Sequence, residues 1–284
     1  MPDPSRVEIR LLRESDIAAA MDLKNLAGWN QTESDWRTLL QLEPNGCFAA
    51  VLDEELVGTT TTTCYGSDLA WVGMVLVRPE KRRAGIATKL LESALHYLDT
   101  KVSTVKLDAT ADGKHVYERL GFEVESLIER WSRKGEAVRL DVQPETVDSD
   151  TRRQILQLDR TAFGADRSKL LNALLASSCV RPGVTTTEAG SVAGYALARS
   201  GSTAAYIGPV VSWERSAAAG AIDQVLEQLH ASPVYIDMNR NWGEGRQLLS
   251  ERGFEKQRDL IRMRRGVATA TSPLVFAIAG PEVG

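Results

Sequence analysis

The feature of this sequence that most limits its fold is an internal repeat. The segment from Val105, VKLDATADGKHVYERLGFE, matches the segment from Val234, VYIDMNRNWGEGRQLLSERGFE, which is three residues longer. Upstream, AWVGMVLVRPEKRRAGIATKLL from Ala70 aligns without a gap with AYIGPVVSWERSAAAGAIDQVL from Ala205. Because self-similarity of this kind marks repeated structural units, we predict two copies of one fold.

The length and composition suit two such domains. The chain has 284 residues, of which 43 % are apolar and 25 % are charged. This is enough for two globular domains of about 140 residues, each with its own core. We place the boundary near Gly135–Ala137, which gives a first domain of residues 1–136 and a second of residues 137–284.

Each copy shows the pattern of an α/β domain: a strand, two helices, a strand meander, a central helix, then strand, helix and strand. The run Trp71–Val77 is almost entirely apolar, as expected of a buried strand. The helix that follows it presents one apolar face. That face consists of Ile86, Leu90, Leu91, Ala94, Leu95 and Leu98. We therefore predict a mixed sheet flanked by helices in each copy.

Several classes of protein are excluded by composition. The net charge of −4 argues against a general nucleic-acid binder. The three cysteines and three histidines are isolated in the sequence, so neither a disulfide nor a metal site is expected. The first residues lack the pattern of a secretion signal, and no apolar run is long enough for a membrane span. We expect a cytoplasmic protein without a membrane or nucleic-acid partner.

A basic segment lies between the apolar strand and the helix in the first copy. Residues 78–88 read RPEKRRAGIAT, with four cations at the amino end of the helix. The helix dipole is already positive there, so this arrangement favours an anion bound by backbone N–H groups and guanidinium groups. A solvated basic loop is the alternative. Neither a Walker phosphate loop nor a dinucleotide-binding GxGxxG motif is present.

At this point the sequence resembles the GNAT acetyltransferase superfamily. Its phosphate-loop signature is met by Arg82, Gly85 and Ala87, and its closing Tyr-x-x-x-Gly-Phe element by Tyr117 and Gly121-Phe122. The resemblance covers about Val7 to Lys134. It implies two tandem GNAT domains, each with a mixed, mostly antiparallel sheet, and an N-acetyltransferase that uses acetyl-CoA as co-substrate.

The resemblance also implies where acetyl-CoA binds, in a V-shaped opening between the strand that ends near Val77 and the following parallel strand. Backbone groups would pair with the pantetheine arm at Met74, Val75, Leu76 and Val77. The pyrophosphate would lie on Arg82, Arg83, Ala84, Gly85, Ile86, Ala87 and Thr88. Thr110, where family members often carry Asn, would offer a hydroxyl to pantetheine.

Catalytic roles follow from the same resemblance. Tyr117 stands where the family places the acid that protonates the leaving CoA thiolate, with an ordinary core tyrosine as the alternative. Asp108, at the end of a parallel strand, is a candidate base, and a structural turn residue is the alternative. His115 is a weaker candidate on a helix start.

The sequence contains fewer signals for the binding site of the acceptor than for that of acetyl-CoA. Trp29, Asn30 and Gln31 lie in the segment that walls the acceptor site in the resembled fold, although Thr32 and Asp35 also form a capping box. We predict acetylation of a small amine or amino-acid-like metabolite. The alternatives are acetylation of a protein amino group and a non-catalytic acyl-CoA sensor. A monomer and a homodimer are both compatible with the sequence.

The second copy has lost the phosphate chemistry. In the gapless alignment Ala217 stands in place of Arg82, Ala218 in place of Arg83, and Ile222 in place of Ala87. We therefore expect a degenerate second GNAT domain. The segment after Val267 is expected to be a strand docked on one domain and is given no chemical role.

Overall fold

The computed structural model describes residues 6–135, 147–229, 232–268 and 272–284. They divide into two compact units. The first unit contains the residues up to Glu125, together with Arg262–Ala268 and Glu282–Gly284. The second contains the described residues of 126–261 and of 269–281. The predicted boundary between residues 136 and 137 falls in 136–146, outside the described residues.

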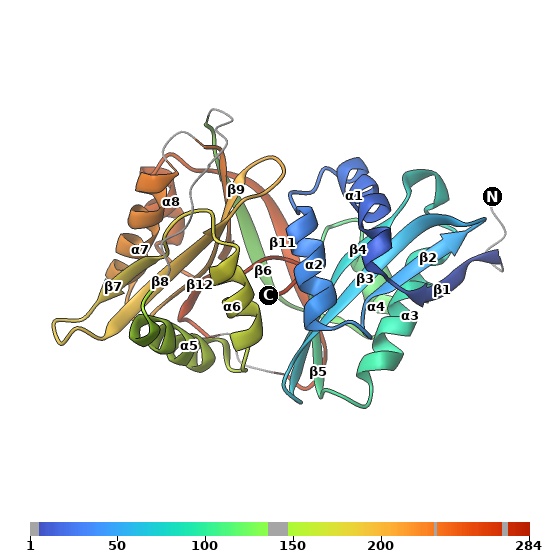
Figure 1. Ribbon diagram of the computed structural model, residues 1–284, viewed down its shortest axis with the longest axis horizontal. Coiled ribbons are helices and arrows are strands. Elements are labelled where there is room, and N and C mark those ends of the chain that lie inside the picture. Colours follow the sequence, from blue (N-terminus) through green and yellow to red (C-terminus); the bar gives the residue numbers. More distant parts are fainter. Residues whose placement is uncertain (1–5, 136–146, 230–231, 269–271) are drawn as a thin grey trace. The chain divides into compact units, whose positions relative to one another are not determined.

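The first copy follows the predicted order of elements (Figure 1). Its helices are α1 (Ile17–Leu26), α2 (Glu33–Leu42), α3 (Ile86–Leu98) and α4 (Lys114–Arg119), with short 3-10 turns η2 (Glu14–Asp16) and η3 (Pro79–Lys81). Its strands are β1 (Glu8–Leu11), β2 (Phe48–Leu52), β3 (Glu55–Tyr65), β4 (Leu69–Val77), β5 (Thr104–Ala109) and β6 (Glu123–Arg133). The capping box of Thr32 and Asp35 starts α2 as predicted.

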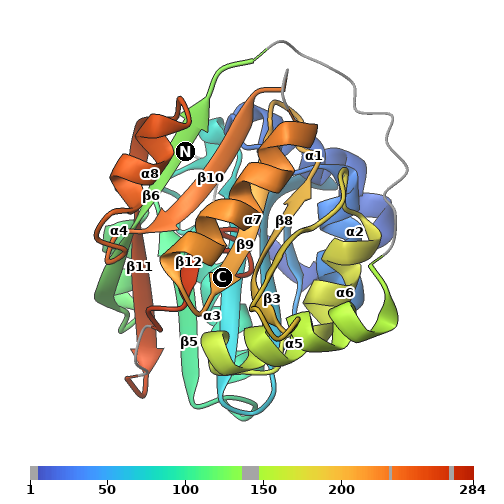
Figure 2. The ribbon, with the colours of Figure 1, turned by 90° about the vertical axis from the view of Figure 1, so that its left-hand side faces the viewer.

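The second copy repeats this order from its two helices onward (Figure 2), and the residues Val138–Leu140, where a first strand would lie, fall outside the described residues. Its helices are α5 (Ser149–Phe163), α6 (Ser168–Ala176), α7 (Arg215–Gln228) and α8 (Gly245–Glu251). Its strands are β7 (Gly183–Thr186), β8 (Val192–Arg199), β9 (Ala205–Ser212), β10 (Val234–Asn239), β11 (Glu255–Gly266) and the additional β12 (Val275–Ala277).

Both units contain the predicted mixed, mostly antiparallel sheet. In the first, β1 to β4 pair antiparallel in sequence order, and β4 and β5 are parallel. In the second, β7 to β9 pair antiparallel, and β9 and β10 are parallel. The α/β fold class is confirmed.

The two faces of the first sheet carry different helices. A Cβ on Gly58 of β3 would touch Leu90 and Ile86, so α3 covers this face. All six apolar residues predicted on one side of α3 are buried. Because side chains alternate along a strand, Thr59, Thr61 and Thr63 face the other way, where α1 and α2 pack against β3 (Figure 1).

Each unit is completed by a strand from the other copy. The last strand of the first copy, β6, pairs antiparallel with β10, with Val234 opposite Arg133 and Asn239 opposite Ile128. The last strand of the second copy, β11, neighbours β5, and its residues from Arg262 onward belong to the first unit. Neither half of the sequence therefore contains all the strands of its own sheet.

Candidate active site

β4 carries a bulge at its centre. Thr59 of β3 pairs with Leu76 and Thr61 pairs with Gly73, so Met74 and Val75 stand opposite Thr60 alone. The Thr59 hydroxyl donates a hydrogen bond to the Met74 carbonyl at 2.8 Å, and Met74 adopts a φ of +49°. A bulge interrupts the regular ladder and redirects backbone groups. The polar groups of this stretch are thereby turned away from regular strand pairing.

β4 also separates from β5 along its second half. The parallel pairing runs from Leu69–Thr104 to Trp71–Lys106 and stops there, although β4 continues to Val77. Among the described residues no strand pairs with Val72–Val77 on that side. β4 and β5 therefore diverge at the place where the resemblance predicts a V-shaped opening for the pantetheine arm.

A tight loop joins β4 to α3. Arg83 and Gly85 both adopt left-handed conformations, with φ of +63° and +76°, and Gly85 is the N-cap of α3. The first helix-type bond after the cap runs from Lys89 N–H to Gly85 O. The N–H groups of Ile86, Ala87 and Thr88 therefore lie in the first turn, where a helix provides no acceptors of its own.

The side chains of this loop divide between core and solvent. Ala84 and Ile86 are buried, so only their backbone can contact a ligand. The Arg82 and Arg83 side chains are exposed, whereas Arg78 is held by Glu55 at 2.8 Å. A Cβ added at Gly85 would meet no atom within 4 Å. The loop thus offers backbone N–H groups, two exposed guanidinium groups, of which that of Arg82 donates to the Val77 carbonyl at 3.3 Å, and open space, which suits a diphosphate.

Tyr117 lies on α4 with its ring edge-on to Phe122, at a centroid distance of 6.0 Å. Burial raises the pKa of Tyr117 to about 12, so its hydroxyl stays protonated at neutral pH. The nearby Thr110 hydroxyl accepts from Gly113 N–H at 3.4 Å, in the turn that begins α4. His115 is exposed and contacts Glu118.

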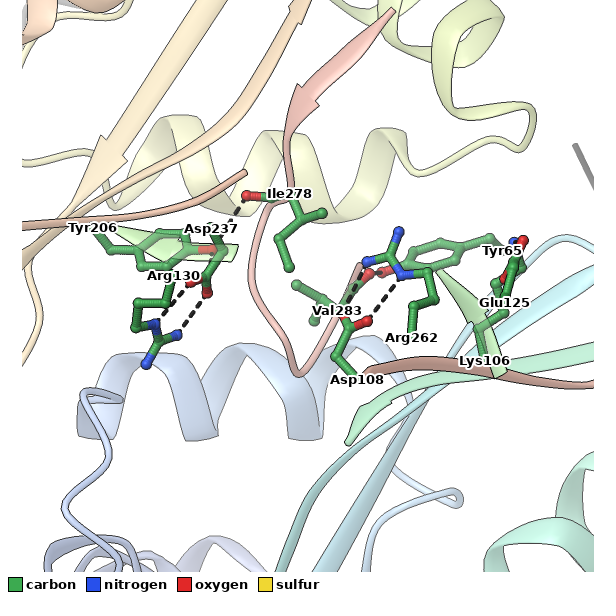
Figure 3. A network of polar contacts seen from close by, with 10 residues as sticks. All are labelled: Tyr65, Lys106, Asp108, Glu125, Arg130, Tyr206, Asp237, Arg262, Ile278 and Val283. Atoms are coloured by element: carbon green, nitrogen blue, oxygen red, sulfur yellow. Dashed lines mark hydrogen bonds and ion pairs between the residues drawn. The ribbon is translucent and has the colours of Figure 1, made fainter. Parts of the chain in front are cut away.

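Asp108 is committed to a buried ion pair. Its carboxylate receives two hydrogen bonds from Arg262 of β11, at 2.9 and 2.8 Å, and its side chain is fully buried (Figure 3). The Arg262 guanidinium also lies over the Trp71 ring. Its repeat partner Asp237 is held in the same way by Arg130, at 2.8 and 2.6 Å. The presence of the same pair in both copies favours the structural alternative for Asp108.

The predicted acceptor wall has an unforeseen neighbour. Asn30 and Gln31 are both 8 % exposed, and Trp29 is half-buried. The Gln31 Nε2 donates to the Glu282 carboxylate at 2.8 Å. The Tyr65 hydroxyl donates to the Val283 carbonyl at 2.6 Å (Figure 3). No local pattern predicts this contact, because 251 residues separate Gln31 from Glu282.

Comparison with known families decides the assignment. Residues 17–122 match the model of the acetyltransferase (GNAT) family, and residues 155–273 match that of an acetyltransferase (GNAT) domain. The chain belongs to the GNAT acetyltransferase family. It is a tandem GNAT protein and an N-acetyltransferase, and the enzymes of this family use acetyl-CoA.

Related proteins agree with this assignment. The chain is 25 % identical over 260 residues to the uncharacterised N-acetyltransferase YitH of Bacillus subtilis, covering 88 % of each chain. Its fold is similar to that of a Pyrococcus horikoshii protein assigned as an acetyltransferase, with a TM-score of 0.79, 22 % identity and coverage of 98 % and 96 %. A tandem GNAT protein from the clavulanic acid pathway gives a TM-score of 0.63 at 16 % identity, with coverage of 93 % and 99 %.

The second GNAT copy has helix where the first has the loop between β4 and α3. In the gapless alignment the first residue of α3, Ile86, corresponds to Ala221, but α7 already begins at Arg215, six positions earlier (221 − 215). Gly220, the counterpart of Gly85, lies within α7. The residues at 217–219 are all alanine, the strongest helix former. The helix therefore extends through the positions that form the open loop before α3 in the first copy.

The second copy also fills its V-shaped opening. The parallel pairing of β9 and β10 stops at Ile207–Ile236. Beyond that point β12 pairs with both strands, since Ala277 lies opposite Val210 of β9 and Met238 of β10. The segment that we expected to dock as a strand thus lies between β9 and β10, at the position where β4 and β5 diverge in the first copy.

Within the described ranges no helix is long and apolar enough to span a membrane. The same residues contain no group of three or more histidine, cysteine or acidic side chains arranged to hold a metal ion.

Proposed function

We propose that this enzyme transfers the acetyl group of acetyl-CoA to the primary amine of a small metabolite or amino-acid-like acceptor, and that the reaction takes place in the first unit. The observation that carries the proposal is the contrast between the copies. The loop at residues 78–88 is open with left-handed residues at Arg83 and Gly85, while its counterpart is helix.

In this proposal the chain binds acetyl-CoA through three groups of residues. Backbone N–H groups at residues 83–88 and the Arg82 and Arg83 side chains hold the pyrophosphate. The bulged stretch Met74–Val77 pairs with the pantetheine arm, which Thr110 can also contact. When bound, acetyl-CoA supplies an activated acyl group. The bulge then offers backbone N–H groups where negative charge develops on the acyl oxygen.

The buried position of Asn30 and Gln31 supports a small acceptor. An acceptor lysine or amino terminus of a protein would need an open groove at this wall. We propose no nucleic-acid or membrane partner, and either a monomer or a homodimer agrees with the fold.

The contrast between the copies predicts the number of binding sites. Calorimetric titration of the full chain with acetyl-CoA should give one site per chain. Among the described residues, the positions aligned with the loop of the first copy lie in the helix at 215–220, and the strand at 275–277 pairs with the edges of β9 and β10. Two equivalent sites per chain would contradict this prediction.

We propose that Tyr117 protonates the leaving thiolate. Tyr117→Phe should lower kcat about 100-fold or more, as expected for loss of a general acid, with the KM for acetyl-CoA little changed. Tyr97→Phe is a matched control, because the Tyr97 hydroxyl donates to Glu43 on the α3 side of the sheet. Steady-state kinetics of both variants test the role, and an unchanged kcat for Tyr117→Phe would rule it out.

A further inference from the structure

The bulge of β4 contains a backbone conformation that needs an explanation. Met74 has a φ of +49°, and among the described residues it is the only non-glycine residue with a positive φ that lies within a strand. This region is unfavourable for a residue with a side chain, because the Cβ comes too close to the following carbonyl oxygen. Strained backbone of this kind persists only where the surrounding structure holds it, and it is concentrated at functional sites.

The Thr59 side chain holds this conformation. Its hydroxyl donates to the Met74 carbonyl at 2.8 Å, and the two residues are 0 % and 2 % exposed. The bulge places this carbonyl outside the regular register, between the pairs Thr59–Leu76 and Thr61–Gly73. A side-chain hydroxyl therefore takes the place of a ladder partner, and solvent cannot replace it at this depth.

The orientation of the Met74 carbonyl also sets that of the next N–H group. The carbonyl of Met74 and the N–H of Val75 belong to one planar trans peptide, in which the two groups point in opposite directions. Because the carbonyl is turned toward Thr59 of β3, the Val75 N–H is directed away from β3. β5 lies on the other side of β4, where the strand pairing has already ended at Trp71.

The second copy lacks both parts of this arrangement. Pro209 aligns with Met74, and its ring fixes φ near about −65°, so the left-handed conformation is closed to it. Tyr195 stands in place of Thr59, and its hydroxyl donates to the buried Asp159 carboxylate. β9 nevertheless carries a bulge. The fold thus forms a bulge without this hydroxyl bond, which is present in the copy that also has the open loop before α3.

We propose that Thr59 is a positioning residue for acetyl transfer. Its hydroxyl holds the Met74–Val75 peptide so that the Val75 N–H donates to the acyl oxygen of acetyl-CoA and stabilises the negative charge that develops there. Thr59 does not touch the substrate and acts through the backbone. This inference rests on the proposed function, because it assumes that acetyl-CoA lies along Met74–Val77.

The test requires acetyl-CoA alone and no acceptor. Isotope-edited infrared spectroscopy of the full chain, with ¹³C at the thioester carbonyl, reports the hydrogen bond to the acyl oxygen. In the wild type this carbonyl band should move to lower wavenumber on binding, because a hydrogen bond weakens the C=O bond. Thr59→Val keeps the shape of the side chain and removes the donor, so the shift should be largely lost. The Kd for acetyl-CoA should stay within about threefold, since the phosphate loop is unchanged.

Two further variants separate positioning from stability. Thr59→Ser keeps the hydroxyl and should keep the band of the wild type. Thr62→Val is a matched control, because Thr62 lies on the same strand, is 0 % exposed and donates to the Gly46 carbonyl at 2.9 Å. Both valine variants lose one buried hydrogen bond, so both should lower the melting temperature by a similar amount. Only Thr59→Val should change the carbonyl band.

The outcomes distinguish this inference from the proposed function. If the wild type does not bind acetyl-CoA, the proposed function fails, and this inference fails with it. If the wild type binds acetyl-CoA and Thr59→Val shows the same displaced band, only the role of Thr59 is wrong. A band that does not move in the bound wild type, or an equal loss of the shift in Thr62→Val, also overturns that role. If Thr59→Val does not fold, Thr59→Ala measured against Thr59→Ser decides the matter.

Discussion

Gly85→Val is expected to weaken acetyl-CoA binding at least 100-fold. Gly85 has a φ of +76°, a conformation that costs an ordinary L-residue about 1–2 kcal/mol and a β-branched one more. The new side chain would also project into the open space that we assign to the pyrophosphate. A loss of about 3 kcal/mol corresponds to roughly a 100-fold change in Kd. Isothermal titration calorimetry with acetyl-CoA measures it directly.

The repeat provides the matched control for this experiment. Gly220 occupies the aligned position in the second copy, but it lies inside α7. Its added Cβ would meet only the Thr185 side chain, at 3.0 Å. Gly220→Ala should leave acetyl-CoA affinity unchanged, whereas Gly85→Ala should already reduce it. Equal effects of the two alanine variants would show that the loop at 82–88 is not the phosphate site.

Asp108→Ala is expected to lower the free energy of unfolding by about 3–5 kcal/mol, because it leaves the Arg262 guanidinium buried without its carboxylate. The Asp108 side chain is fully buried and that of Arg262 is 8 % exposed, so solvent cannot replace the lost partner. Urea unfolding of the full chain, followed by tryptophan fluorescence, measures the change.

Asp237→Ala tests the same interaction in the second unit. The Asp237–Arg130 pair has the same bidentate geometry, and we expect a similar loss of stability. The two variants also distinguish a structural from a catalytic role. If Asp108→Ala keeps the stability of the wild type and loses only kcat, Asp108 is the base and the structural interpretation is wrong.

Much of the candidate site could be predicted from local sequence. The repeat, the strand Leu69–Val77 and the helix Ile86–Leu98 are marked by hydrophobic periodicity, which depends only on near neighbours. The turn at Gly85 and the loss of cations in the second copy are local as well. The repeat alignment matches Gly73 with Gly208, but it does not show why both positions hold glycine. In each unit a distant backbone, at Glu282 or Ile278, occupies the space of the missing side chain.

The sequence by itself determined the fold class and the duplication, and it predicts which copy binds the phosphate, since each of these follows from the spacing of residues along one segment. Only the tertiary structure decided which strand completes each sheet, that Asp108 is paired with Arg262, and that Glu282 meets Gln31. Strand partners and buried ion pairs depend on the total burial and hydrogen bonding of groups that lie more than 100 residues apart, as the separations of 154 and 251 residues show. No local pattern encodes such a choice, because β6 and β11 occupy equivalent positions in the repeat and yet each joins a strand of the other copy.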